Sequence, residues 1–186
     1  ALAVELAILA PQRVRGLILD GVPLFDDDQE LVDSVLHEYF ADLTPDRHGS
    51  HLVRAWHVTR DMALWWPWFN QAAAGRRTAD PYPAQMLQRV TADLMRSLPG
   101  YDVAYRAAWL WPGTERLPLV TQPTLAGSSP ADPLRAMTPR ALGLLRGARE
   151  ATFPLLLDQA GPAKLAATIT EFTTAIDQPS RKGSRT

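Results

Sequence analysis

Apolar and polar positions along the chain follow two patterns, one typical of buried strands and one typical of amphipathic helices. Short apolar runs bounded by glycine or proline occupy residues 16–21, 119–127 and 150–153. The first run predicts a strand buried on both faces, as in a parallel sheet, the second predicts a strand running into a glycine turn, and residues 150–153 predict a short edge strand. Because Pro123 cannot donate a ladder hydrogen bond, the second strand is expected to start after it.

The stretch between the first two predicted strands has helical spacing and no convincing strand. It is expected to hold helices over residues 26–43, 50–64, 83–98 and 101–110. Its acidic start at residues 26–28 suits the positive end of a helix dipole, and Ser50 is expected to cap the second helix. Outside this stretch, residues 1–10 are expected to form a buried helix ending at Pro11, and further helices are expected over residues 137–145 and from Pro162 onward.

The order of these elements is strand, helical insertion, strand, helix, strand, helix, which predicts an α/β fold. We expect a partial core of about three parallel strands with flanking helices in residues 1–24 and 112–177, an inserted all-helical lid in residues 25–111, and a disordered tail in residues 178–186. A helix that starts at residue 1 with no N-cap residue and no initiator Met also predicts that a segment precedes Ala1 in the intact protein.

Composition excludes several functional classes. The chain has 186 residues and a net charge of −1, so nothing indicates a nucleic-acid surface. No apolar run reaches the roughly 20 residues of a membrane span. Cysteine is absent, which excludes disulfides, thiolate metal sites and a cysteine nucleophile, and it fits a reducing, cytoplasmic setting. We expect no cofactor and no metal, and the oligomeric state stays open.

Several local motifs resemble the C-terminal part of the α/β-hydrolase fold superfamily. Residues 1–7 followed by residues 11–19 look like the helix after the family's nucleophile elbow and its sixth strand. Residues 122–127 look like the strand leading to the family's acid loop, and the last helix looks like the closing helix. The insertion sits where the family places its lid. The resemblance implies that the intact parent is a serine hydrolase of a small ester, amide or related substrate.

The family's chemistry needs a serine nucleophile, a histidine base and an acid that orients the histidine. No G-x-S-x-G occurs in this sequence, and the resemblance places the serine just upstream of Ala1. Asp132 stands where the family carries its acid, although it lies further from Gly127 than is common. Asp20 is the second candidate for the acid. Both residues also suit ordinary turn positions.

The family's histidine would follow Phe153, but residues 154–161 contain none. The four histidines of the chain all fall in the insertion, and none has the i, i+4 partner of a zinc helix: His37, His48, His51 and His57. The chain is therefore expected to be an inactive fragment of a hydrolase. The alternative is a non-catalytic hydrolase-like protein that binds an apolar small molecule under the lid.

Tryptophans gather in the insertion, where they are expected to line an apolar substrate pocket: Trp56, Trp65, Trp66, Trp68 and Trp109. Packing of the lid's own core is the competing interpretation. A third hypothesis for the whole chain is an all-helical ligand-binding domain, such as that of a transcription regulator. In the hydrolase interpretation, the first strand presents an unpaired edge, so the isolated chain is expected to be marginally stable or prone to aggregate.

Overall fold

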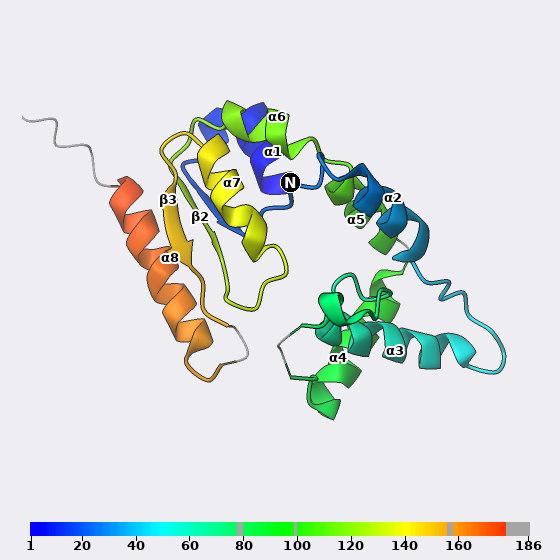
Figure 1. The fold of residues 1–186 in the computed structure, drawn as a ribbon. Coiled ribbons are helices and arrows are strands. Elements are labelled where there is room, and N and C mark those ends of the chain that lie inside the picture. Colours follow the sequence, from blue (N-terminus) through cyan, green and yellow to red (C-terminus); the bar gives the residue numbers. More distant parts are fainter. Residues whose placement is uncertain (78–79, 99, 156–157, 178–186) are drawn as a thin grey trace, which may run out of the picture. The chain divides into compact units, whose positions relative to one another are not determined.

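The computed structural model describes residues 1–77, 80–98, 100–155 and 158–177, and the predicted tail at 178–186 lies outside them. Eight α-helices and three strands occur in these ranges (Figure 1). The chain divides into two compact units. The α/β unit consists of Ala1–Leu24 and the chain from Gly113 onward, and the helical unit consists of Phe25–Pro112.

The α/β unit is built on three parallel strands in the order β1 (Leu17–Asp20), β2 (Thr124–Ser128) and β3 (Arg149–Thr152). The three predicted strands are thus confirmed, and so is the partial α/β fold. The second strand does start after Pro123, whose carbonyl accepts a hydrogen bond of 2.9 Å from the Leu17 amide. Three parallel strands contradict the all-helical alternative.

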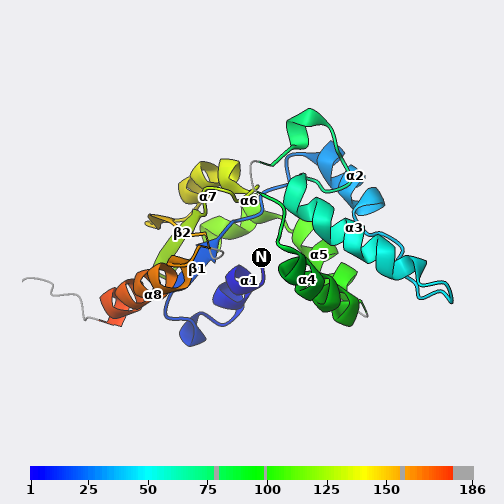
Figure 2. The same cartoon turned by 90° about the horizontal axis from the view of Figure 1, so that it is seen from below.

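Helices cover both faces of this sheet. Figures 1 and 2 show α7 (Thr138–Leu144) and α8 (Gly161–Asp177) on opposite sides of the strands. Under α8, a buried cluster joins Leu125 of β2 to Phe153 and Phe172. On the α7 side, the Thr138 hydroxyl donates to the Ser128 hydroxyl at 3.1 Å. Coverage of both faces explains the apolar character of β1 and β2, whereas β3, of sequence Arg-Glu-Ala-Thr, is mostly exposed.

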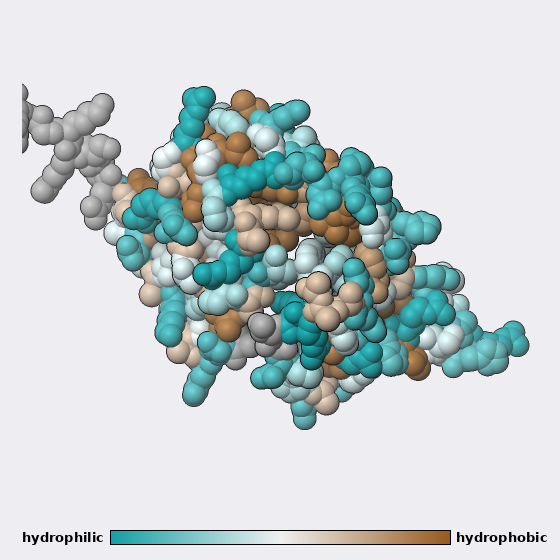
Figure 3. Space-filling model, in the orientation of Figure 1, coloured by the Kyte–Doolittle hydropathy of each residue, from teal (hydrophilic) through white to brown (hydrophobic). Residues whose placement is uncertain are grey.

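The first helix, α1 (Leu2–Leu9), is only partly buried, so the prediction of a buried helix is wrong for half of its surface. Val4 and Ala7 are buried, whereas Leu2, Leu6 and Leu9 are 83%, 53% and 77% exposed. Helical spacing places these three leucines on one side of α1. Figure 3 shows hydrophobic residues at the surface in the region of α1 and of the short helix α6 (Gly113–Arg116).

The helical unit contains α2 (Gln29–Glu38), α3 (Ser50–Leu64), α4 (Ala84–Ser97) and α5 (Tyr101–Trp109), which confirms the four predicted helices. The first is shorter than predicted because Asp28 caps it, accepting a 3.0 Å hydrogen bond from the Leu31 amide. Within the described ranges, every helix is too short or too polar to cross a bilayer.

Candidate active site at the strand ends

Each of the three parallel strands has a polar residue at its carboxyl end. β1 ends at Asp20, β2 at Ser128 and β3 at Thr152. In open α/β sheets, ligands bind at this edge, because the loops that leave the strands there are free to vary. The candidate acid Asp132 follows β2 by four residues, so it lies on one of these loops.

Asp132 is fixed by its own turn. Its amide donates to the Ser129 carbonyl at 3.1 Å, and its Oδ1 accepts a 2.7 Å hydrogen bond from the Leu134 amide. These are the bonds of a turn-forming aspartate, which was the competing interpretation of this residue. Its other oxygen, Oδ2, faces the end of β1.

Gly21 allows the loop after β2, which carries Asp132, to lie close to the end of β1. Gly21 has a φ of 65°, and a Cβ on it would lie 2.5 Å from Asp132 Oδ2. A side chain at residue 21 would therefore both strain the backbone and displace the carboxylate. Asp132 and Asp20 consequently share the carboxyl edge of the sheet.

The environment of Asp20 includes the charge of Asp132. Partial burial raises the pKa of Asp20 above its ordinary value, and the negative charge of Asp132 raises that pKa further. Like charges held close together disfavour double ionisation, which is the electrostatic pattern of acid pairs in active sites. Both aspartates named from the sequence thus lie at one place, and which of them acts as an acid stays a prediction.

A small polar pocket of about 120 Å³ lies at the same edge, between the ends of β2 and β3. Ser128 and Thr152 end these strands, and Arg135, Thr138 and Glu150 complete its polar lining. Sequence reasoning missed this pocket. The polar run that follows β2 could have indicated it, because serines directly after a buried strand place hydroxyls at the ligand-binding edge.

No histidine of the α/β unit accompanies these groups, because all four histidines belong to the helical unit. His37 lies on α2, His48 precedes α3, and His51 and His57 lie on α3. In the described ranges, no group of three or more histidine, aspartate or glutamate side chains is placed to hold a metal ion.

Asp46, Ser50 and His51 form a cluster. These are the residue types of a catalytic triad, but their hydrogen bonds are not those of a triad. The Ser50 hydroxyl donates to Asp46 rather than to His51, and the His51 Nδ1 accepts from the Asp46 amide at 3.2 Å. The Asp46 carboxylate also accepts the His48 and His51 amides, at 2.8 and 3.1 Å. The cluster therefore caps α3, and the prediction that Ser50 is the cap is wrong: Asp46 performs that role.

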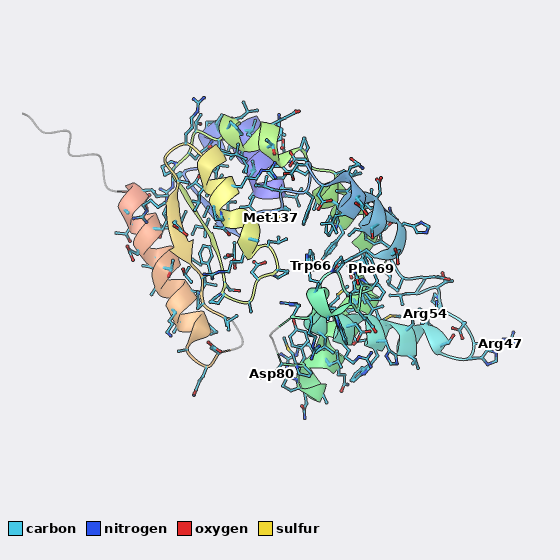
Figure 4. The ribbon with its side chains drawn as sticks, viewed as in Figure 1. Arg47, Arg54, Trp66, Phe69, Asp80 and Met137 are labelled. Atoms are coloured by element: carbon cyan, nitrogen blue, oxygen red, sulfur yellow. The ribbon has the colours of Figure 1, made fainter. Side chains whose placement is uncertain are left out.

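The tryptophans named from the sequence lie in two settings. Trp66 and Trp109 stack with ring centroids 5.8 Å apart, and Trp68 donates from its indole nitrogen to the Tyr39 carbonyl at 3.1 Å. Trp65 lies under Arg76, at 4.9 Å, and Trp56 is 36% exposed on α3. Figure 4 labels Trp66 in the segment that follows α3. Trp66, Trp68 and Trp109 contribute to the core of the helical unit, and their part in substrate binding stays a prediction.

Two solved structures are similar to this chain. The structure of Rv0554 from Mycobacterium tuberculosis matches with a TM-score of 0.49 and 17% identity, over 95% of this chain and 62% of that chain. The crystal structure of an alpha/beta hydrolase from Sphaerobacter thermophilus matches with a TM-score of 0.44 and 17% identity, over 91% and 63%. An α/β hydrolase is among its structural neighbours.

The chain spans a little under two thirds of the length of each of these two structures. Comparisons with protein-family models and with curated proteins found no match.

Proposed function

We propose that this chain carries the acid and the helical lid of a serine hydrolase that acts on a small ester or amide. The observation that supports this proposal is the position of Asp132. It lies on the loop after β2, at the carboxyl edge of a parallel sheet, with one oxygen held by the Leu134 amide. In a serine hydrolase, a carboxylate held in this way accepts a hydrogen bond from the Nδ1–H group of the histidine, which fixes the tautomer of the base.

The remaining chemistry would come from outside this chain. The sequence has no G-x-S-x-G, and residues 153–161 hold no histidine. A hydroxyl attacks a carbonyl carbon only when a base takes its proton, so Asp132 by itself cannot form an acyl-enzyme. The proposal therefore makes this polypeptide an inactive fragment of a larger parent, whose setting would be the cytoplasm.

The test compares this chain with a form extended by the in-frame upstream coding sequence. We expect a fluorophosphonate probe to leave this chain unlabelled and to label a serine of the extended form. If the upstream segment also supplies a histidine to Asp132, Asp132→Asn should lower kcat of that form by about 10⁴, because a misoriented histidine is a poor base. Glu171→Gln, an exposed carboxyl change on α8, is the matched control and should leave kcat unchanged. An upstream sequence without a nucleophile elbow would refute the proposal.

A second candidate is a hydrolase-like protein that binds an apolar small molecule under its lid and performs no chemistry. The sequence has no histidine after β3, which favours this second candidate, because a serine upstream would still lack its base. Saturable binding of an ester without turnover by the extended form would support the second candidate over the first.

A further inference from the structure

The small polar pocket of about 120 Å³ beside β2 and β3 has no part in the proposed function. Three segments form it: the end of β2 with Ser128, β3 with Glu150 and Thr152, and the turn that runs from Arg135 into Thr138 of α7. Its volume is about the liquid volume of four water molecules, well below the roughly 300–1,000 Å³ of sites for larger ligands. The pocket therefore has room for a ligand of only a few heavy atoms.

The strand residues that line the pocket lie on one face of the sheet. Ser128 and Thr152 are paired in the register of β2 with β3, so their side chains point to the same side. The Thr138 hydroxyl donates to the Ser128 hydroxyl at 3.1 Å, which identifies this side as the face covered by α7. Glu150 precedes Thr152 by two residues on β3, so its carboxylate lies on that face as well.

Arg135 and Glu150 give the pocket one charge of each sign. Among the residues that the structure describes, no ion pair within 4.0 Å and no hydrogen bond engages either side chain. The cation next to Glu150 in the sequence, Arg149, lies on the opposite face, where its guanidinium is 5.6 Å from the centre of the Phe172 ring. A simple anion would be repelled by Glu150 and a simple cation by Arg135, whereas a ligand with both charges would be attracted by both.

We propose that this pocket binds a small zwitterion, such as a short α-amino acid, with its carboxylate at Arg135 and its ammonium group at Glu150. A guanidinium presents a planar fork of donors that matches a carboxylate. The hydroxyl of Thr152 can donate to the ligand carboxylate or accept from its ammonium group. The inference goes beyond the proposed function and does not rest on it, because no bond of the ligand is made or broken.

The first experiment compares L-alanine with propionate, which lacks its ammonium group, and with ethylamine, which lacks its carboxylate. Ligand-observed NMR on the whole chain, at neutral pH and low ionic strength, measures binding to exposed charges without strong screening. We expect alanine to bind about tenfold or more tightly than either analogue, the lower range for a lost hydrogen bond to a charged group. Propionate that binds as tightly as alanine would indicate a simple anion site and would overturn the inference, as would the absence of alanine binding.

Two charge variants identify which group holds each end of the ligand. Arg135→Gln should weaken alanine about tenfold and remove its preference over ethylamine, and Glu150→Gln should weaken it similarly and remove its preference over propionate. Arg149→Gln, which removes a cation from the opposite face, is the matched control and should leave alanine binding unchanged. A loss as large in Arg149→Gln as in Arg135→Gln would mean that the overall charge and not the pocket controls binding, and the inference would be wrong.

A third experiment locates the site. Thr152→Trp should fill the pocket and abolish alanine binding, whereas Thr174→Trp, at an exposed position of α8 outside the lining, should not. Circular dichroism verifies that each variant is folded. Intact binding in a folded Thr152→Trp variant would place the ligand elsewhere and overturn the inference. Fluorophosphonate labelling of the extended form without alanine binding would retain the hydrolase proposal and remove this inference, and the opposite pair of results would do the reverse.

Discussion

The two units of this chain are stabilised in different ways. The α/β unit depends on close backbone packing: Gly127 of β2 approaches β3 so closely that a Cβ there would lie 1.7 Å from the Ala151 carbonyl oxygen. The helical unit depends on side chains. Its rings contact one another in pairs, among them Phe25 with Trp109 at 3.9 Å and Tyr101 with Tyr105 at 4.9 Å.

This difference affects how the proposed acid and the helical-unit pocket are held in place. Asp132 is positioned by a backbone amide and by the missing side chain of Gly21, so its geometry survives most side-chain changes nearby. The helical unit contains a pocket of about 460 Å³ that is bounded by residues 39–45, Val58, Leu94 and Tyr101, so its shape changes with side chains from several segments. The proposed acid is therefore held more rigidly than the walls of that pocket.

The largest expected effect is that of Gly127→Ala. The added methyl group would overlap the β3 backbone, which cannot yield as a flexible side chain would. We expect the α/β unit to lose about 3 kcal/mol or more of stability, the upper range for overpacking. Urea unfolding followed by circular dichroism reports this loss. Gly143→Ala on α7 is the control: a Cβ there meets nothing within 4 Å, so the change should be neutral or stabilising by up to about 1 kcal/mol.

Tryptophan fluorescence sharpens this experiment, because all six tryptophans belong to the helical unit. If the two units are stabilised independently, Gly127→Ala should leave the fluorescence transition in place while the circular-dichroism transition changes. Equal shifts in both signals would show that the units unfold as one, and the comparison between them would fail.

A smaller effect is expected from Asp61→Ala, which acts on the helical unit. The Asp61 side chain is 6% exposed, and its carboxylate accepts from Arg60 at 2.7 Å and from Gln71 at 3.2 Å. Its removal leaves these donors without their acceptor, at a cost of about 2 kcal/mol. The fluorescence transition should shift to lower urea. Asp93→Ala, whose ion pair with Arg96 is exposed, should shift it by less than about 0.5 kcal/mol; equal shifts for the two variants would contradict the expectation.

The elements of the fold were predictable because their signals are local. Apolar runs ended by glycine or proline gave the three strands, and Pro123 placed the start of β2. The exposure of Leu2, Leu6 and Leu9 was not predictable, because an apolar helix looks the same in sequence whether or not a neighbour covers it. The cap of α3 was misassigned because Asp46 reaches it from a loop four residues before Ser50.

The candidate site was only partly predictable for a related reason. Asp20 and Asp132 could each be named from their positions after strands, and parallel pairing of β1 with β2 brings them to one edge. The small pocket beside Ser128 is formed by residues far apart in the sequence, and so is the pocket of about 460 Å³ in the helical unit. No local pattern encodes such a convergence. The tryptophans were predicted to line a pocket because they are large and clustered in the sequence, whereas the pockets of the helical unit are lined by tyrosine and leucine.

The smallest effect concerns the pH dependence of stability at the strand ends. Burial and the charge of Asp132 raise the pKa of Asp20 above its ordinary value of 3.8. At pH values between the ordinary pKa and the raised pKa of the folded state, the folded protein holds a proton that the unfolded chain has released. Stability therefore falls as pH rises through this window. Asp20→Asn removes the charge and should stabilise the protein at pH 7, by less than about 1 kcal/mol because Asp20 is exposed to screening solvent.

This gain from Asp20→Asn should shrink as pH falls toward the ordinary value, because the wild-type carboxyl is then protonated in both states. Thermal unfolding of both proteins from pH 3 to pH 8 measures it, with Glu171→Gln as the control for removing an exposed carboxyl. A gain that does not vary with pH would mean that the repulsion between Asp20 and Asp132 is not its source. A loss at pH 7 would mean that the Asp20 carboxylate is a favourable part of the edge, and the shared acid site would have to be abandoned.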